Sequence, residues 1–253
     1  KGSIVAIIKG TKIEDVVNVL KKLSTLERLS VKEVTMDFSD SMQAIVETIF
    51  PKAMITLDRF HVQQLCSNAM QEVRVRIVRE ARKAEIQYRE DHTFKLKRRL
   101  AHRKKDKTDK RGRKPNRKNE AYKPERLENG DTVIELLTRS RYLLMTSSDN
   151  WTDSQKTRAR LLFERFPEMK TAYGLTHSLR MIFSNKEATK DSAAESLKRW
   201  YNKVTDYDND AFNTVSATIY QREDEVLNYF VYRSTNASAE SLNAKIKSFR
   251  AQL

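Results

Sequence analysis

The chain contains few of the residues that interrupt helices or cross-link a fold. Its 253 residues include 5 Gly, 4 Pro and 1 Cys. With so few helix breakers, a mainly helical protein is predicted. The single cysteine, Cys66, excludes an intramolecular disulfide and a cysteine-based zinc site. No apolar run approaches the roughly 20 residues of a membrane span, and no signal peptide is recognisable, so no membrane partner is predicted.

Positive charge, in contrast, is abundant. The formal net charge is +15 and the isoelectric point is near 9.8, which favours a polyanionic partner such as nucleic acid. Between His92 and Arg126 the sequence holds 16 Lys or Arg against 4 Asp or Glu. Within this stretch, residues 110–115 are typical of a hook for the DNA minor groove, with Arg111, Arg113 and Lys114 as candidate contacts. A merely solvated basic loop is the alternative.

The first sixty residues alternate between strand-like and helix-like patterns. A short run of β-branched and apolar residues at Ser3–Lys9 predicts a buried strand. Two further strands are predicted at Val31–Met36 and Ala53–Leu57. Helical spacing of apolar residues covers Lys12–Leu23 and Ser41–Phe50. Strands separated by helices of this length indicate parallel βαβ units.

The remainder of the chain reads as helices. One long helix, or two in line, is predicted over Arg59–Ala101, followed by a basic loop at about residues 103–123. Further helices are predicted at Thr132–Met145, Thr152–Phe166, Glu168–Phe183, Lys190–Lys203, Asp210–Phe230 and Asn236–Phe249.

Three acidic residues stand out by position. Asp37 and Asp58 each follow a predicted strand, at the sheet edge where ligands bind in open α/β sheets. Glu240 lies far along the chain, at the start of the last predicted helix. Carboxylates brought together in this way can hold Mg²⁺ or Mn²⁺. Each residue also has an ordinary alternative: Asp37 and Asp58 as helix caps, and Glu240 as an anion in a first helical turn.

The local sequences around these acids resemble a known family. The stretches are Thr35–Met42, Phe50–Ala53 followed by Thr56–Val62, and Thr235–Lys247. Together they are similar to the DDE transposases of bacterial insertion sequences, of the ISL-three type, and residues 151–152 and 162–167 are similar to the helical part of that family. The resemblance covers essentially the whole chain.

The resemblance implies an α/β, mostly helical fold. A truncated ribonuclease-H-like core (residues 1–66, βαβαβ) would be interrupted by a large all-α insertion (67–230) before a returning core helix (231–253). The implied activity is metal-dependent DNA cleavage and strand transfer at transposon ends. The implied partners are double-stranded DNA, both ends and target, bound by a homodimer at the nucleoid in the bacterial cytoplasm.

The same resemblance assigns the site. Asp37 and Glu240 are the expected catalytic residues and metal ligands, with two Mg²⁺ or Mn²⁺ ions in the complete enzyme. Asp58 and His61 are expected to orient the ligands or contact the substrate, and a triad of Asp37, Asp58 and Glu240 is the alternative. The family's first Asp lies upstream of Lys1, so we expect the isolated chain to lack one ligand and to be weakly active or inactive.

Three further residues are candidate DNA contacts. Arg59 is placed to clamp a phosphate or to pair with Asp58. Asn243 and Lys247 follow Glu240 at helical spacing and share its face, where they can reach DNA or serve as an ordinary polar surface. Two other functions stay open: a DNA-binding or bridging module without catalysis, and a metal-dependent nuclease that does not join ends.

Overall fold

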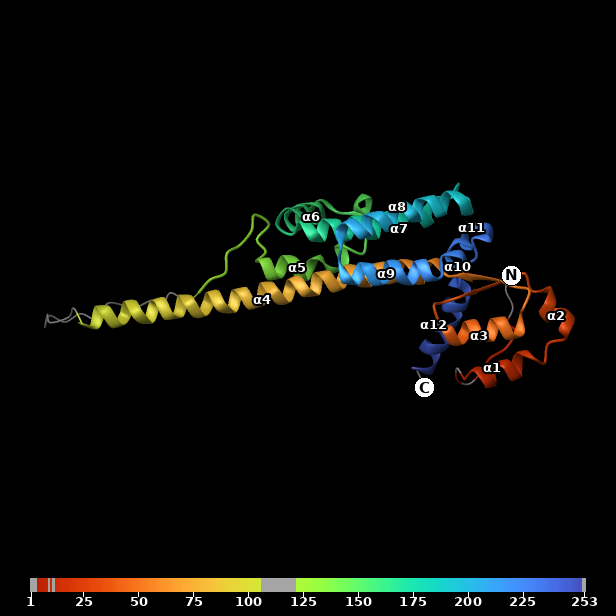
Figure 1. The fold of residues 1–253 in the computed structure, drawn as a ribbon. Helices are drawn as coiled ribbons and strands as arrows, with labels where there is room; N and C mark the ends of the chain where they lie inside the picture. The colour runs from red at the N-terminus through yellow and green to blue at the C-terminus, as the bar shows by residue number, and fades with distance from the viewer. Residues whose placement is uncertain (1–3, 9, 11, 106–121, 252–253) are drawn as a thin grey trace. The chain divides into compact units, whose positions relative to one another are not determined.

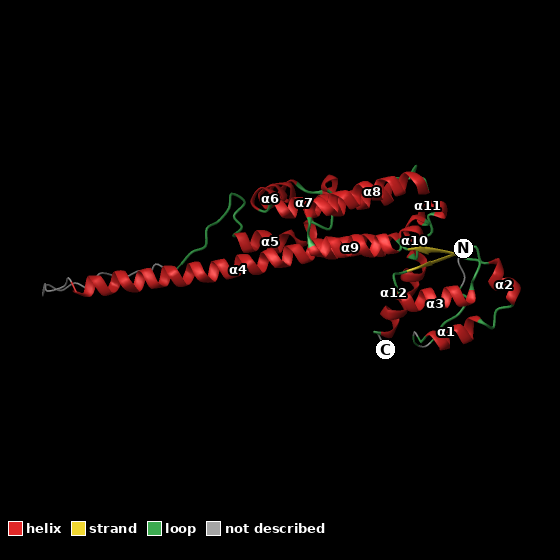
Figure 2. Cartoon of the chain, viewed as in Figure 1, coloured by secondary structure: helices red, strands yellow, loops and turns green. Residues whose placement is uncertain are grey.

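A computed structural model describes residues 4–8, 10, 12–105 and 122–251 of the chain (Figure 1). Most of these residues are in helices, and the described residues include two short strands (Figure 2). The chain forms two compact units: residues 1–70 with 174–253, and residues 71–173. Helices α4 (Arg59–Lys105) and α7 (Pro167–Ser184) each contribute to both units.

The first unit contains a parallel βαβ motif. Strands β1 (Glu33–Met36) and β2 (Met54–Leu57) pair in parallel, in a register that sets Glu33 opposite Met54 and Met36 opposite Leu57. Helix α3 (Asp40–Ile49) makes the crossover and buries Ile45, Val46 and Ile49. The alternation of strands and helices predicted for this stretch is therefore confirmed from β1 to β2.

Two short helices precede this motif. Helix α1 (Ile13–Leu20), which the helical spacing of its apolar residues predicts, packs against α3. Helix α2 (Thr25–Ser30), which the sequence pattern does not predict, begins with a capping box between Ser24 and Glu27. The reciprocal hydrogen bonds satisfy backbone donors that an uncapped helix start leaves unpaired.

The prediction of a strand at Ser3–Lys9 is wrong for the residues that the structure describes. The described residues 4–8 are in no strand, and the side chains of Ile4, Val5 and Ile7 are exposed. The β-branched composition of the run favours extended backbone, but a strand exists only when a neighbour accepts its hydrogen bonds. In the described part of the chain the sheet is limited to β1 and β2, so composition alone misjudged this segment.

The rest of the first unit is helical. It includes the start of α4, the end of α7, α8 (Lys190–Tyr207), α9 (Asp210–Gln221), α10 (Glu223–Leu227), α11 (Tyr229–Tyr232) and α12 (Ala237–Arg250). Trp200 is fully buried, and its indole N–H donates to the carbonyl oxygen of Leu175 at 2.9 Å. The indole therefore belongs to the core.

The single helix predicted over Asp210–Phe230 is broken in the structure, near Arg222. The backbone of Arg222 leaves helical geometry (φ −122°, ψ 30°). This break lets α10 pack on β2, where the side-chain amide of Asn228 donates to the carbonyl oxygen of Ile55 at 2.8 Å. Tertiary contacts with the sheet therefore override a helical pattern that is continuous in sequence.

The second unit combines the remainder of α4, helix α5 (Val133–Leu143), a 3₁₀ turn (Ser148–Asn150), helix α6 (Asp153–Arg165) and the start of α7. The rings of Trp151, Phe163 and Tyr173 cluster, with centroids 5.3 to 6.3 Å apart. The indole N–H of Trp151 donates to the carbonyl oxygen of Leu143 at 3.1 Å. Trp151 is thus also a structural residue.

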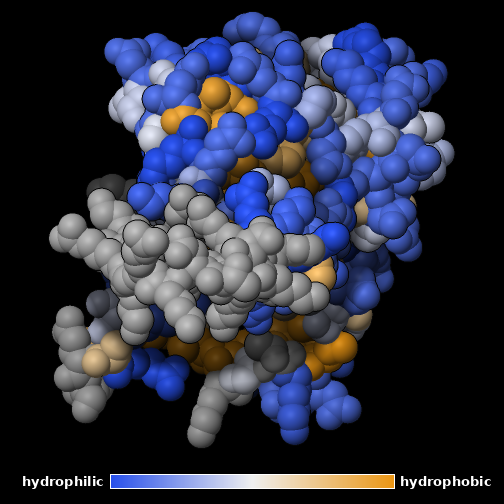
Figure 3. Space-filling view, turned by 90° about the vertical axis from the view of Figure 1, so that its left-hand side faces the viewer, coloured by the Kyte–Doolittle hydropathy of each residue, from blue (hydrophilic) through white to orange (hydrophobic). Residues whose placement is uncertain are grey.

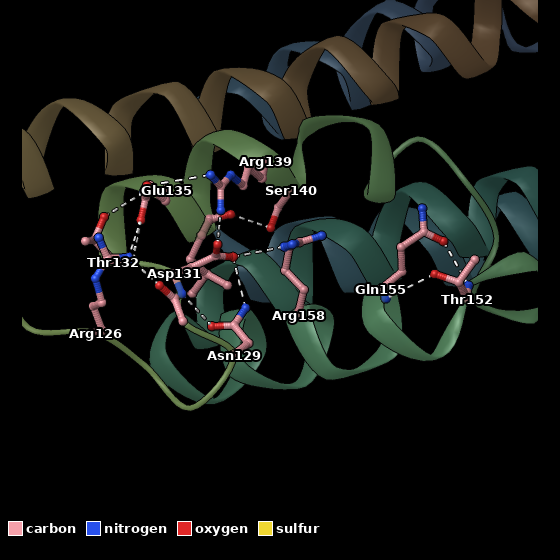
Figure 4. A network of polar contacts seen from close by, with 12 residues as sticks. Arg126, Asn129, Asp131, Thr132, Glu135, Arg139, Ser140, Thr152, Gln155 and Arg158 are labelled. Atoms are coloured by element: carbon pink, nitrogen blue, oxygen red, sulfur yellow. Dashed lines mark hydrogen bonds and ion pairs between the residues drawn. The ribbon is translucent and has the colours of Figure 1, made fainter.

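A buried carboxylate connects α5 and α6 (Figure 4). Asp131 is 2% exposed; it accepts a hydrogen bond from Arg158 Nε at 3.1 Å and another from Arg139, on α5. Asn129 donates to the same carboxylate at 2.9 Å. Burial alone would raise the pKa of Asp131, but the hydrogen bonds and positive charges of the two arginines outweigh it and lower that pKa.

Hydrophilic side chains cover most of the face shown in Figure 3, and hydrophobic side chains appear there as separate patches. Such a surface agrees with a chain in which 33% of residues are charged. Among the described helices, none combines the length and the apolar character that crossing a bilayer requires.

Candidate active site

Two of the three acidic residues follow neighbouring strands. Because Met36 is paired with Leu57 in a parallel register, Asp37 and Asp58 come next at the same edge of the sheet. The backbone N–H of Asp58 donates to the carbonyl oxygen of Met36 at 2.9 Å, which continues the ladder to this point. The edge is the carboxyl end of both strands, as the sequence predicts.

Both carboxylate oxygens of Asp58 accept hydrogen bonds from backbone N–H groups. Oδ1 accepts from Phe60 at 2.7 Å, in the first turn of α4, and Oδ2 accepts from Asn236 at 2.6 Å, directly before α12. The residue is 2% exposed. A buried carboxylate needs such donors to offset the loss of water. Asp58 therefore caps one helix and anchors the entry of another.

Glu240 reaches the same place from α12. Its backbone N–H donates to the carbonyl oxygen of Asn236 at 2.9 Å, so it lies in the first turn of α12. Its Oε1 is 3.5 Å from Nε2 of His61, in the first turn of α4, and both side chains are partly exposed. Asp58 and His61 thus each hold α12, one through the backbone and one through the Glu240 carboxylate.

A second connection, which the sequence does not predict, also joins the sheet to the segment before α12. Glu33 on β1 accepts hydrogen bonds from the Thr56 hydroxyl on β2 and from the Ser234 hydroxyl, both at 2.6 Å. Ser234 precedes α12 by a few residues. No local motif in the sequence reveals that Ser234 pairs with Glu33 or that Asn236 pairs with Asp58, because the two residues of each pair are far apart along the chain.

Asp37 has a different environment. It is half-buried, and its Oδ1 accepts a hydrogen bond from the backbone N–H of Ser39 at 3.1 Å. The helix cap of α3 is Ser39 itself, whose hydroxyl accepts from the N–H of Met42 at 3.4 Å. Among the hydrogen bonds and ion pairs of the described residues, none joins Asp37 to Glu240.

A pocket opens beside Glu240, with a volume of about 310 Å³. Its walls come from the start of α4, the end of α7 and the start of α12, and it combines two carboxylates with two guanidinium groups. The lining residues are Asp58, Arg59, Phe60, Gln63, Arg180, Ser184, Thr235, Ala237 and Glu240. Asp37 is not among them. Arg180 lies in the segment predicted as helical insertion, and no sequence motif marks it.

The candidate DNA contacts fall in three places. Arg59 lines the pocket, with its guanidinium carbon 5.6 Å from the centre of the Tyr229 ring. Asn243 and Lys247 are exposed on α12, whose side chains are exposed or half-buried throughout the described part. Arg111, Arg113 and Lys114 lie outside the described residues.

The donor chemistry of Asp37 and Glu240 fits a hard divalent cation, which prefers carboxylate oxygens. The hydrogen bond to Ser39 engages only Oδ1 of Asp37, and the Glu240 carboxylate is partly exposed. Among the described residues, no group of three or more His, Cys, Asp or Glu is arranged to hold a metal ion. The two acids match the ligand type without forming a closed cage.

The comparison with protein families identifies the class. The model of the ISL3 (ISL-three) type of DDE transposase, described as Transposase, matches residues 1–252. The chain belongs to this transposase family. Membership indicates an enzyme of transposition with DNA as its partner, in a family that generally uses divalent metal ions. No curated protein and no solved structure matches the chain.

Proposed function

We propose that the chain is the catalytic part of a DNA transposase that cleaves transposon ends and joins them to a target. The observation that carries the proposal is the convergence of α12 on the carboxyl edge of β1 and β2. Two contacts from the start of α4, Asp58 to Asn236 and His61 to Glu240, bring residues roughly 180 positions apart to one place. An acid delivered to such an edge is a common way to build a phosphoryl-transfer site.

In this proposal Asp37 and Glu240 are the catalytic residues and hold Mg²⁺ or Mn²⁺. Two such ions, when bound, activate the attacking oxygen and stabilise the leaving oxygen. Asp58 and His61 position α12 and the Glu240 carboxylate. Because both Asp58 oxygens already accept backbone hydrogen bonds, we favour positioning over metal ligation for this residue.

The substrate in this proposal is double-stranded DNA, both transposon ends and target, held by a homodimer in the bacterial cytoplasm at the nucleoid. Arg59, Asn243 and Lys247 contact the backbone near the site, and Arg111, Arg113 and Lys114 contact DNA farther away. The fold we propose is a ribonuclease-H-like core, residues 1–66 and 231–253, interrupted by the helical insertion 67–230.

Substitution of the two acids tests this function. In the full-length protein, Asp37→Asn and Glu240→Gln should each reduce cleavage and joining of labelled transposon-end DNA by at least about 10³-fold, because each removes a charge that holds a metal ion. DNA affinity should stay within about twofold, because phosphate contacts dominate it. The matched controls are Asp40→Asn and Glu195→Gln, which alter exposed acids of the same unit.

The outcomes separate the alternatives. Loss of both reactions with retained binding supports the transposase. Joining that persists in Asp37→Asn contradicts the assignment of the site. Wild-type protein that cuts ends without ever joining them is a nuclease. Wild-type protein that binds ends and does neither reaction in Mg²⁺ or Mn²⁺ is a binding module.

A further inference from the structure

Phe60 is exposed in an unusual position. It is a large aromatic residue in the first turn of α4, it is 55% exposed, and it lines the pocket beside Glu240. Its backbone is fixed by the hydrogen bond from its N–H to Asp58 Oδ1. The ring meets His61 edge-on, with centroids 5.6 Å apart and planes at 79°. A ring held in this way can offer a face to a planar ligand.

Positive charge lies in the same pocket. Arg59 and Arg180 line it from α4 and α7 respectively. A guanidinium group matches the geometry of a phosphate better than an ammonium does. The two arginines balance the charge of the two carboxylates in the pocket, and either guanidinium group can pair with a phosphate oxygen. Gln63, Ser184 and Thr235 add an amide and two hydroxyl groups that can hydrogen-bond to base or sugar.

The size of the pocket limits the ligand. About 310 Å³ is at the small end of the range for pockets that hold organic ligands. Such a volume suits one nucleotide and excludes a base pair with its neighbours. An aromatic ring can stack on a base only where the base has left the duplex or never belonged to it.

Resting on the proposed function, we infer that this pocket takes one unpaired nucleotide of the transposon end. The base stacks on Phe60 and the adjoining phosphate binds Arg180, next to the Glu240 carboxylate. The helical segment that contributes Arg180 therefore takes part in substrate binding. Phe60 and Arg180 bind a frayed or overhanging end, and they do not contribute to the binding of intact duplex.

Binding without catalysis tests the inference. The full-length protein is titrated, in EDTA, with an end duplex that has a three-nucleotide single-stranded overhang containing 2-aminopurine, and with the blunt duplex of the same sequence. Phe60→Ala should weaken binding of the overhang on the order of tenfold and relieve the quenching of 2-aminopurine, because stacking on the ring is lost. Phe60→Trp should restore both. Affinity for the blunt duplex should not change.

Arg180 is tested in the same assay. Arg180→Met should weaken overhang binding and make it less sensitive to salt, and Arg180→Lys should recover part of the loss. The matched controls are Phe249→Ala and Arg199→Met, which alter exposed residues of the same unit outside the pocket. Thermal unfolding of each variant identifies any loss that comes from misfolding.

Two results would overturn the inference: equal effects of Phe60→Ala on overhang and blunt duplex, or unchanged quenching in that variant. Since the assay excludes divalent ions, its result does not depend on whether Asp37 and Glu240 catalyse. The stacking pocket and the catalytic assignment can therefore fail separately.

Discussion

The carboxylate of Asp58 accepts a hydrogen bond of 2.6 Å from the backbone N–H of Asn236, across 178 positions of sequence. This contact fixes where α12 begins relative to the end of β2. Because Glu240 follows in the first turn of α12, its position depends on Asp58 through the backbone of Asn236. Asp58 therefore has a structural role, which its position in a motif similar to a catalytic one does not indicate.

Replacing Asp58 should destabilise the first unit. Asp58→Ala leaves the N–H groups of Phe60 and Asn236 without their acceptors and removes the cap of α4. Together these losses should lower the free energy of unfolding by about 3 kcal/mol. Urea unfolding followed by circular dichroism measures the change. The control Asp206→Ala alters an exposed acid of α8 and should change stability by less than about 0.5 kcal/mol.

Replacing His61 should affect function much more than stability. The contact between His61 and Glu240 is 3.5 Å long and partly exposed, so its contribution to folding is at most about 1 kcal/mol. His61→Ala should nevertheless slow cleavage about tenfold or more, since Glu240 loses the group that orients it. Paired measurements of unfolding and of cleavage by the full-length protein test this. A loss of stability as large as that of Asp58→Ala would contradict it.

The sequence predicted local structure well. The motif from β1 to β2, the long α4 and most later helices follow from apolar spacing and from few glycines and prolines. The structure adds that Thr132 and Thr152 cap two of these helices. The failures are tertiary in origin. Residues 4–8 have the composition of a strand without a partner strand, and the helix predicted over 210–230 breaks where α10 packs on β2.

The site was predicted in part. Local motifs located Asp37, Asp58, His61 and Glu240, and strand periodicity predicted that the two aspartates share an edge. Nothing local revealed that Asn236 donates to Asp58, or that Arg180 lines the same pocket, because these contacts join helices that are remote in sequence. The roles of Asp37 and Glu240 as metal ligands stay predictions.

Acid should destabilise the second unit through Asp131. The arginines lower the pKa of this carboxyl below its usual 3.8. A carboxylate with a lowered folded-state pKa stabilises the fold above the unfolded-state pKa, and this stabilisation is lost as the pH falls through the folded value. Asp131→Asn should therefore cost about 2 kcal/mol at pH 7 and progressively less below about pH 4.

Urea unfolding at pH 7 and pH 3 measures this dependence. The matched control is Asp153→Asn, which alters a fully exposed acid of the same unit that contacts Lys156 at the surface. That variant should differ from wild type by less than about 0.5 kcal/mol at either pH. If Asp131→Asn cost as much at pH 3 as at pH 7, loss of packing and not of charge would be its cause.

Cys66 should report on unfolding of the first unit. The thiol is fully buried beside Thr176, and burial raises its pKa to about 12. A thiol that is both protonated and inaccessible does not react with thiol reagents at pH 8. We expect labelling of native protein to be at least about 100-fold slower than labelling in urea. Rapid labelling of the folded chain would show that the α4–α7 contact at Cys66 opens readily.

Anomalous diffraction from Mn²⁺ tests the central claim most directly. Crystals of the full-length protein bound to transposon-end DNA, grown with Mn²⁺, would be measured near the manganese edge. The account predicts a manganese peak bound by carboxylate oxygens of Asp37 and Glu240, with both Asp58 oxygens still on the N–H groups of Phe60 and Asn236. A peak bound by neither acid, or Glu240 remote from Asp37 in that complex, would contradict it.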